Sequence, residues 1–303
     1  MIDLVMCGLR SCNAHCKYCA CYDSVHNNND KFQYNWPKVR EALKDKDCSD
    51  IMIWGADPIV SWNSFKKTVE FVESLGQRTQ IYASTNGSTL TDEVIDYLNE
   101  HNIKVQLSHD GVAEHYKLDF DPLDRYDITK LNSVVINCVI HNRNCDIAKN
   151  IDYFSKKVPT IKVAFSLPQI SKENDFTIHK ENADKLIGQC AALLLSDNPM
   201  YRLNVPTGDD YRVDYRKEMP TDGCLMSEGI SNHIDTLGNW VQCNLTDSLN
   251  KPLEFRRNEI CNKCKYRYST LCGVCGLLEP PDSCYFLKRL NRLLEATQKS
   301  SSF

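Results

Sequence analysis

The stretch RSCNAHCKYCACYD, from Arg10 to Asp23, carries four cysteines in fourteen residues. Three of them, Cys12, Cys16 and Cys19, follow the spacing C-x3-C-x2-C. A structural zinc site is closed by four ligands, and a disulfide framework needs an even number of cysteines. Three thiols therefore indicate a metal centre that keeps one position open. A zinc knuckle that borrows a distant fourth ligand is the alternative.

The cysteines directly follow a short apolar run at residues 2–8, which predicts a strand with the thiols in the loop behind it. Further strand-like runs occupy residues 50–55, 79–85, 103–108, 133–140 and 160–167, and amphipathic stretches occupy residues 36–45, 64–76, 91–101, 145–157 and 181–195. Strands that alternate with helices of this length predict βαβ units and a parallel sheet. Six such strands fit an α/β fold with a partial (β/α)6 TIM-like barrel.

The alternation stops near Pro199, and the segment that follows is rich in Pro, Gly and Asp. We therefore expect a barrel at residues 1–200, a linker at 201–222, and a small cysteine-rich domain with a C-terminal helix at 223–303.

The composition is that of an ordinary globular protein, with 42% apolar and 25% charged residues among 303. The net charge of −4 disfavours the binding of duplex nucleic acid through phosphates. No run of eighteen apolar residues exists, so no membrane span is expected. Sixteen cysteines, ten of them in two groups, without an export signal favour metal ligation in the reducing cytoplasm over disulfides.

Six scattered cysteines are expected to be packed in the core, because free cysteine is among the most buried residue types. They are Cys7, Cys21, Cys48, Cys138, Cys145 and Cys190. Seven others crowd the last eighty residues: Cys224, Cys243, Cys261, Cys264, Cys272, Cys275 and Cys284. Paired C-x2-C units are also typical of zinc ribbons, so zinc remains the alternative for this second group.

The first motif, with Tyr18 as its aromatic residue, resembles the C-x3-C-x-φ-C signature of the radical S-adenosylmethionine (SAM) superfamily. WGADP, after the second predicted strand, resembles that family's Gly-Gly-Glu-Pro turn, with Ala and Asp replacing the usual Gly and Glu. STNG and LSHDG, at the next two strand ends, resemble its SAM-contacting segments. The resemblance covers residues 1–200 and assigns SAM binding to Tyr18, Gly55, Ala56, Asp57, Pro58, Ser84, Asn86, Ser108 and Asp110.

The resemblance implies that Cys12, Cys16 and Cys19 bind a [4Fe–4S] cluster whose fourth iron chelates SAM. Reductive cleavage of SAM would then give a 5′-deoxyadenosyl radical that abstracts hydrogen from a substrate. The cofactor supplies this chemistry, and the protein supplies orientation.

The C-terminal array resembles the SPASM extension of the same superfamily, which holds two auxiliary [4Fe–4S] clusters. By that resemblance Cys224, Cys243 and Cys275 bind the first cluster, and Cys261, Cys264, Cys272 and Cys284 bind the second. The internal spacings x7 and x2 depart from the family's x5 and x3. We also expect a β-hairpin that carries Cys243 and turns at Leu237–Asn239.

The SPASM resemblance implies a peptide or protein substrate that is oxidatively modified or crosslinked. An enzyme that rearranges or dehydrogenates a small molecule or nucleotide is the second hypothesis, and a zinc-stapled binding module is the third. Expected partners are an electron donor such as flavodoxin or ferredoxin and a separate peptide-delivery protein, since no leader-binding domain precedes the first strand. Asn244 replaces the Asp of sulfatase-maturating enzymes, which disfavours formylglycine formation. No catalytic acid or base can be assigned.

Overall fold

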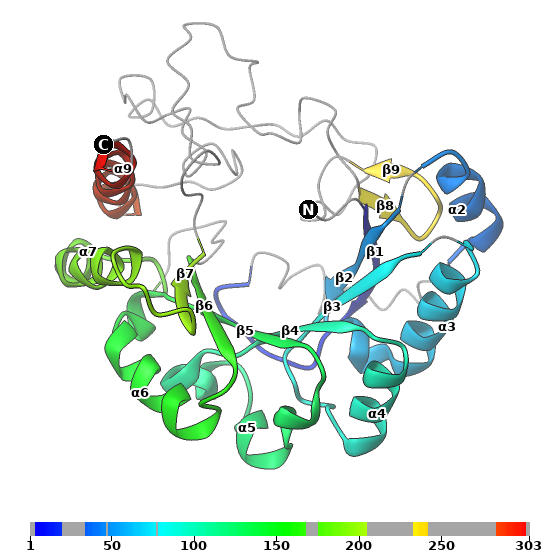
Figure 1. Ribbon diagram of the computed structural model, residues 1–303, viewed down its shortest axis with the longest axis horizontal. Helices are drawn as coiled ribbons and strands as arrows, with labels where there is room; N and C mark the ends of the chain where they lie inside the picture. The colour runs from blue at the N-terminus through cyan, green and yellow to red at the C-terminus, as the bar shows by residue number, and fades with distance from the viewer. Residues whose placement is uncertain are drawn as a thin grey trace, which may run out of the picture.

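The computed structural model describes residues 4–19, 34–46, 48–76, 78–167, 175–204, 233–241 and 283–300. Within these residues nine strands form one sheet in the order β7-β6-β5-β4-β3-β2-β1-β8-β9. All neighbouring strands are parallel except β8 and β9, which pair antiparallel. The sheet curves into an open arc with helices along its outer side (Figure 1).

The six expected barrel strands are confirmed, and each lies on an apolar run identified in the sequence. They are β1 (Leu4–Ser11), β2 (Asp50–Ala56), β3 (Gln80–Thr85), β4 (Lys104–Ser108), β5 (Val134–Val139) and β6 (Lys162–Ser166). Consecutive strands are neighbours in the sheet, as expected for repeated right-handed βαβ units. The fold is therefore an α/β partial barrel.

The outer layer consists of the amphipathic stretches predicted as helices. They are α2 (Trp36–Leu43), α3 (Trp62–Glu73), α4 (Asp92–Glu100), α6 (Ile147–Lys157) and α7 (Lys180–Leu194). Side-chain caps fix several helix starts: Thr91 accepts from the Val94 amide, and Asp146 accepts from the Lys149 amide. Such caps typically contribute about 1 kcal/mol each because they satisfy a free N–H of the first turn.

The core lies between the sheet and this helical layer. Alternate β2 residues such as Ile51 and Ile53 are fully buried and belong to one apolar cluster with Phe65 and Val69 of α3. Residues between them, such as Met52, are only half-buried, so the inner face of the arc is less tightly covered. Full burial of such apolar side chains contributes roughly 1.5–3 kcal/mol each.

Short helical elements follow the carboxyl ends of three strands. They are η1 (Pro58–Ser61) after β2, η2 (Gly111–Tyr116), α5 (Pro122–Arg125) and η3 (Ile128–Lys130) after β4, and η4 (Asn142–Asn144) after β5. Of these, η1, η2 and η4 add side chains to the same edge of the sheet as the loop after β1, which is where parallel barrels place their active sites, whereas η3 leads into β5 at the opposite edge.

Three short strands extend the sheet beyond the six expected ones. β7 (Tyr201–Leu203) pairs with β6, although residues 201–222 were expected to be a linker. β8 (His233–Asp235) pairs in parallel with β1 and forms the expected hairpin with β9 (Trp240–Val241). Gly238 adopts a φ of 81° in the turn between β8 and β9. Part of the stretch assigned to the C-terminal domain thus belongs to the barrel sheet.

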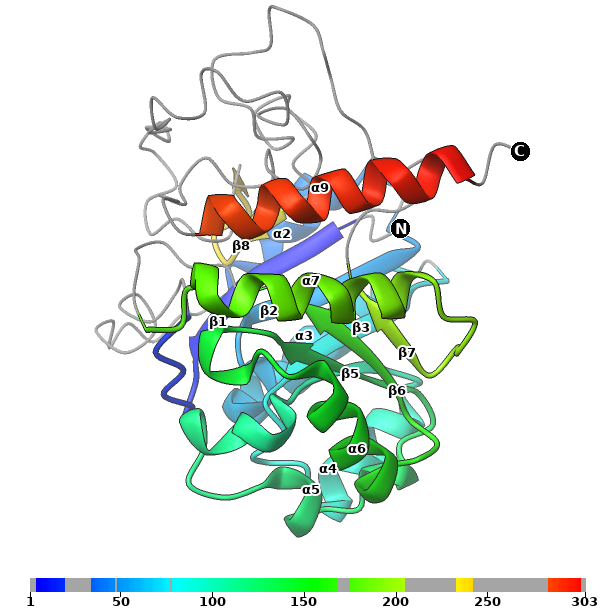
Figure 2. The same ribbon diagram turned by 90° about the vertical axis from the view of Figure 1, so that its left-hand side faces the viewer.

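Helix α9 (Ser283–Ser300) lies alongside α7 (Figures 1 and 2). Its apolar side, including Phe286 and Leu290, is buried, and Arg289 forms an ion pair with Asp184 of α7 at 2.6 Å. Neither α9 nor any other helix in the described ranges combines the length and apolar character needed to cross a membrane.

Three of the scattered cysteines confirm the expected core packing, since Cys48, Cys138 and Cys190 are buried. Cys145 is only half-buried. Cys21 lies outside the described residues, and only the backbone of Cys7 is described.

Candidate functional site

The three thiols of the first motif lie in one loop behind β1. Cys12 and Cys16 are half-buried, and Cys19 is exposed. The Cys19 amide donates to the Cys16 carbonyl at 2.9 Å, which closes a tight turn. In the part of the chain that the structure describes, no three His, Cys, Asp or Glu side chains gather as a single-ion site.

The surroundings of Cys12 and Cys16 disfavour their thiolate forms. Burial raises the pKa of Cys12 to about 11 and that of Cys16 to about 12. Both thiols are therefore protonated at neutral pH, whereas a metal binds the thiolate, so metal binding releases protons. The Ala14 amide and the Asn86 side-chain amide point toward Cys12 Sγ at 3.4 and 3.7 Å and favour its charged form.

The loop behind β3 holds the thiol loop from one side. Asn13 Oδ1 accepts hydrogen bonds from Asn86 Nδ2 and from Ser88 Oγ, each at 3.0 Å. Asn86 and Ser88 are buried. The STNG segment therefore touches the thiol loop through side chains, which fixes the distance between these two strand ends.

Residues behind β4 hold the same loop from the other side. The Tyr18 hydroxyl donates to Asp110 Oδ2, and both side chains are buried. The His15 amide donates to the Lys117 carbonyl at 3.0 Å. Lys117 Nζ donates to the Ser108 carbonyl at 2.7 Å and lies 4.0 Å from Asp110 Oδ1. The motif's aromatic residue thus anchors the loop to a buried charged pair.

Asp110 and Lys117 are both charged although they are buried. Burial alone would raise the pKa of Asp110, but the charge of Lys117, the nearby His141 ring and the hydrogen bond from Tyr18 lower it below its usual range. Burial alone would lower the pKa of Lys117, but the carboxylates of Glu114 and Asp110 raise it above its usual range. Removal of one partner of such a buried pair leaves an uncompensated charge, which typically costs 3–5 kcal/mol.

The WGADP turn follows β2 with an unusual backbone. Gly55 has a φ of 133° and Ala56 a φ of 52°, a conformation that costs a residue with a Cβ roughly 1–2 kcal/mol. Asp57 then caps η1, where Pro58 is the first residue, by accepting from the Ile59 amide at 3.1 Å.

The Asp57 carboxylate is fully engaged inside the protein. It also accepts from Thr85 Oγ1 at 3.0 Å and from the Asn86 amide at 2.7 Å, and burial raises its pKa above the usual range. The Asp57 amide donates to the Ser11 carbonyl at 2.8 Å. Asp57 therefore joins the ends of β1, β2 and β3.

The hydroxyl groups at the ends of β3 and β4 differ in whether they have a hydrogen-bond partner. Ser84 Oγ is buried and has no hydrogen-bond partner. Such an orphaned hydroxyl is rare in folded proteins and calls for a ligand or water. Ser108 Oγ, in contrast, accepts from Lys117 Nζ at 3.2 Å. The orphaned hydroxyl and the strained turn lie on neighbouring strand ends, and so these residues fit a polar ligand such as SAM beside the thiols.

Several residues of this site were not identified from the sequence. Glu114 lies in η2 and Lys117 is the residue that caps it. Their spacing of three positions matches no recognisable motif, so the sequence did not point to them as site residues. His141 follows β5 at a strand end, a position that could have pointed to it. It is fully buried, neither ring nitrogen has a hydrogen-bond partner, and Nε2 lies 3.7 Å from Asp110.

The second cysteine group is not placed by the structure. Cys224, Cys243, Cys261, Cys264, Cys272 and Cys275, together with Asn244, lie outside the described residues. Of Cys284 only the backbone is described, in the first turn of α9. The auxiliary-cluster ligands therefore remain a prediction from the sequence.

Comparison with known proteins finds a matching family model and two curated relatives. Residues 7–131 match the family model of the Radical SAM superfamily. A curated relative, the radical SAM cyclopropyl synthase TigE of Paramaledivibacter caminithermalis, is 24% identical over 185 residues. Another, the cysteine-type anaerobic sulfatase-maturating enzyme of Clostridium novyi, is 25% identical over 142 residues. These matches support the radical SAM superfamily.

Both matches to curated relatives are partial. They cover 52% and 42% of this chain and 38% of each relative. The match to the Radical SAM superfamily model supports a [4Fe–4S] cluster and SAM as cofactors, but not a number of clusters.

Solved structures that bind AdoMet or a precursor peptide share the fold. Native anSMEcpe with bound AdoMet superimposes with a TM-score of 0.63 and 14% identity over 98% of this chain and 100% of that chain. Streptococcus suis SuiB bound to precursor peptide SuiA gives a TM-score of 0.59 and 13% identity over 91% of this chain and 71% of that chain. At this level of identity the likeness shows the fold alone.

Proposed function

We propose that this protein reductively cleaves SAM and abstracts a hydrogen atom from a peptide or protein substrate, which it oxidises or crosslinks. The observation that carries the proposal is the meeting of three elements at one sheet edge: the thiol loop, the strained Gly55–Ala56 turn and the orphaned hydroxyl of Ser84. A cluster and a SAM molecule need such a pairing of thiolates with free polar groups.

Within this proposal Cys12, Cys16 and Cys19 hold the cluster, and the turn at Gly55–Ala56 and the Ser84 hydroxyl hold SAM. When bound, cluster and SAM supply a 5′-deoxyadenosyl radical. The chain's own residues keep the reactants in place: Tyr18 and Asn13 tie the thiol loop to the ends of β4 and β3. Orientation of this kind is the protein's main contribution in cofactor enzymes.

Three thiol substitutions test the first half of the proposal. The variant with Cys12, Cys16 and Cys19 all replaced by Ala is expected to yield no 5′-deoxyadenosine with dithionite and SAM. The matched control replaces the buried Cys48, Cys138 and Cys190 by Ser or Ala one at a time and keeps the activity. Cleavage of SAM by the triple variant would show that the site is elsewhere.

The peptide substrate is supported by the relatives. The structures of anSMEcpe with Cp18Cys peptide and of SuiB with precursor peptide SuiA are peptide complexes of proteins with this fold. Within the proposal, flavodoxin or ferredoxin supplies electrons in the cytoplasm, and a separate protein delivers the peptide. The second candidate, a small molecule or nucleotide as substrate, has no specific observation in its favour.

Anaerobic co-expression with neighbouring open reading frames tests the substrate class. A peptide that loses a pair of hydrogen atoms, seen by mass spectrometry, is the expected result. A change in a nucleoside or small metabolite, with every peptide unchanged, would favour the second candidate.

Iron and sulfide analysis after reconstitution is expected to give about twelve of each per chain for three [4Fe–4S] clusters. A value near four would show a single cluster per chain and would contradict the two SPASM-type auxiliary clusters.

A further inference from the structure

A cavity of about 640 Å³ lies at the opposite end of the sheet from the thiols. It is lined by the first residues of the barrel strands and by the loops that lead into them, whereas the thiol loop follows the carboxyl end of β1. The lining residues are Met52, Tyr82, Lys104, Val105, Gln106, Thr129, Leu131, Asn132, Ser133, Val134, Val135, Thr160, Ile161 and Lys162. The volume falls within the range of small-molecule sites, roughly 300–1,000 Å³.

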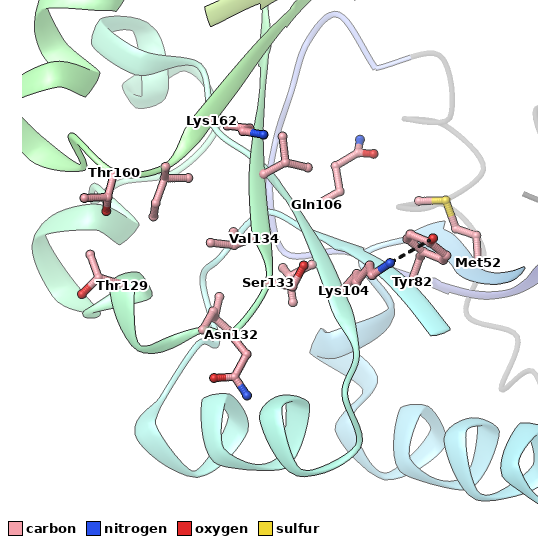
Figure 3. A pocket seen from close by; sticks show the side chains of 14 residues that line it. Met52, Tyr82, Lys104, Gln106, Thr129, Asn132, Ser133, Val134, Thr160 and Lys162 are labelled. Atoms are coloured by element: carbon pink, nitrogen blue, oxygen red, sulfur yellow. Dashed lines mark hydrogen bonds between the residues drawn. The ribbon is translucent and has the colours of Figure 1, made fainter. Parts of the chain in front are cut away.

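The sheet register brings the polar side chains of this cavity to one face. Gln106 of β4 pairs with Val135 of β5, which pairs with Lys162 of β6. Lys104 precedes Gln106 by two positions and therefore shares its face. Figure 3 shows Lys104, Gln106 and Lys162 around the cavity. With strand spacings of about 4.8 Å and a rise of about 3.3 Å per residue, the Cα atoms of the two lysines lie roughly 12 Å apart.

Two lysine side chains at this separation can reach a common anion, because each extends about 6 Å from its Cα and keeps its charge at the tip. Among the fourteen lining residues Lys104 and Lys162 are the charged ones, and none is a carboxylate. In the described ranges neither lysine has an ion pair. Lys104 Nζ contacts the Tyr82 hydroxyl at 3.4 Å and lies over its ring at 5.1 Å.

One acidic residue, Asp50, contacts the cavity wall without being a lining residue. Asp50 forms a hydrogen bond with the Tyr82 hydroxyl, which raises the pKa of that tyrosine, but Asp50 is not a lining residue. The rest of the wall offers hydroxyl and amide donors, such as Thr160, Ser133 and the half-buried Gln106, beside aliphatic side chains. Two lysines without a lining carboxylate, beside hydroxyl and amide groups, favour an anion over a cation in this cavity.

We propose that this cavity is a second binding site, which takes a small organic anion whose phosphate or carboxylate group sits between Lys104 and Lys162. The aliphatic wall formed by residues such as Leu131 and Ile161 holds an apolar body. The site is separate from the thiol edge, so it binds its ligand whether or not SAM is cleaved.

Isothermal titration of the reconstituted full chain tests the proposal with three matched probes: phenyl phosphate, phenylacetate and neutral benzyl alcohol. Binding of either anion, weakened by added salt, together with no binding of benzyl alcohol is expected. Binding of phenyl phosphate alone identifies phosphate as the recognised group, and binding of phenylacetate alone identifies carboxylate. Heat from neither anion overturns the proposal.

Variants tie that binding to the cavity. Lys104→Met and Lys162→Met are each expected to weaken the anion about tenfold, and Lys162→Arg to restore it. Lys156→Met, which removes an exposed lysine of α6 outside the cavity, is the control and leaves affinity unchanged. Equal affinity in all four variants would mean that the anion binds elsewhere and would overturn the site. Lys162 is exposed, so its replacement leaves the fold intact.

Discussion

Tyr18 shows how one residue serves two purposes at the thiol loop. Its ring packs against His141 and Phe176 at centroid distances of 5.0 and 5.8 Å, and its hydroxyl donates to the buried Asp110. Hydrogen bonds to a charged acceptor contribute about 1.5–3 kcal/mol, more than those between neutral groups. The aromatic residue of the motif is therefore an anchor for the loop as well as an apolar contact.

Tyr18→Phe keeps the ring and removes only that hydrogen bond. We expect the free energy of unfolding, measured anaerobically in urea, to fall by about 2 kcal/mol because Asp110 loses a partner. The control is Tyr126→Phe, whose hydroxyl donates to the neutral Ser88 carbonyl at 3.0 Å, with an expected loss of about 1 kcal/mol. An equal loss in both variants would show that the charge of Asp110 adds nothing to the anchor.

Ala56 carries backbone strain that a glycine would relieve. Ala56→Gly is expected to stabilise the protein by up to about 1 kcal/mol, because the φ of 52° costs Ala more than Gly. Ala192→Gly on the exposed side of α7 has a helical backbone and is expected to lose up to about 1 kcal/mol instead. Thermal unfolding measures the stability of both variants. A loss of stability in Ala56→Gly would contradict the inference that the backbone at Ala56 is strained.

At the element scale, Asp121 connects three segments behind β4. It caps α5 by accepting from the Leu123 amide at 2.9 Å, and it accepts from His109 Nε2 at 2.9 Å and from the Tyr153 hydroxyl of α6. Burial alone would raise the pKa of Asp121, but the hydrogen bonds from His109 and Tyr153 lower it to about 2. A single carboxylate thus docks α5 and α6 on the end of the sheet.

This lowered pKa predicts a pH dependence of stability. The ionised Asp121 stabilises the fold above the unfolded-state pKa of about 3.9, and the contribution is lost as the pH falls toward 2. We expect Asp121→Asn to be less stable than the wild type by about 1 kcal/mol at pH 6, because the carboxylate is partly open to water. The difference should shrink between pH 4 and pH 2 in urea titrations.

Asp152→Asn provides the matched control for that titration. Asp152 pairs with Lys156 one turn away in α6, and both side chains are more than 60% exposed, at 64% and 71%. Such surface pairs contribute little, so this variant should follow the wild type at every pH. A difference between wild type and Asp121→Asn that stays constant down to pH 2 would exclude ionisation as its cause.

At the scale of the whole molecule, the hairpin of β8 and β9 joins residues beyond 232 to the start of the chain. β8 pairs with β1, and the Asn35 amide at the start of α2 donates to the Thr236 carbonyl at 2.7 Å. Gly238 packs so closely on α2 that an added Cβ would lie 2.7 Å from the Lys38 carbonyl carbon. This contact, far apart in sequence, closes the N-terminal edge of the six-stranded barrel sheet.

Gly238→Ala is expected to destabilise the protein by at least 2 kcal/mol, because the positive φ and the collision with α2 both act against it. Gly76→Ala is the control: its φ of 71° is similar, but nothing lies within 4 Å of the added Cβ. It should lose only about 1 kcal/mol. Equal losses of unfolding free energy in the two variants, measured in urea, would show that the hairpin can move away from α2 without destabilising the barrel.

The sequence alone determined the elements whose signal is local. Six strands and five amphipathic helices follow from hydrophobic periodicity, and the thiol spacing marked the loop behind β1. The hairpin turn at Gly238 and the burial of Cys48, Cys138 and Cys190 were also predictable, because turn chemistry and the burial of free thiols depend on residue type.

The tertiary structure decided the contacts between distant residues. Tyr18 and Asp110 are separated by 92 positions, and no local pattern relates them or brings Lys117 and His141 beside them. The short strand β7 was missed because three residues become a strand only when β6 is present to pair with them. Local periodicity sets which residues face the sheet, whereas the meeting of strand ends, and with it the site, depends on the order of strands in the sheet.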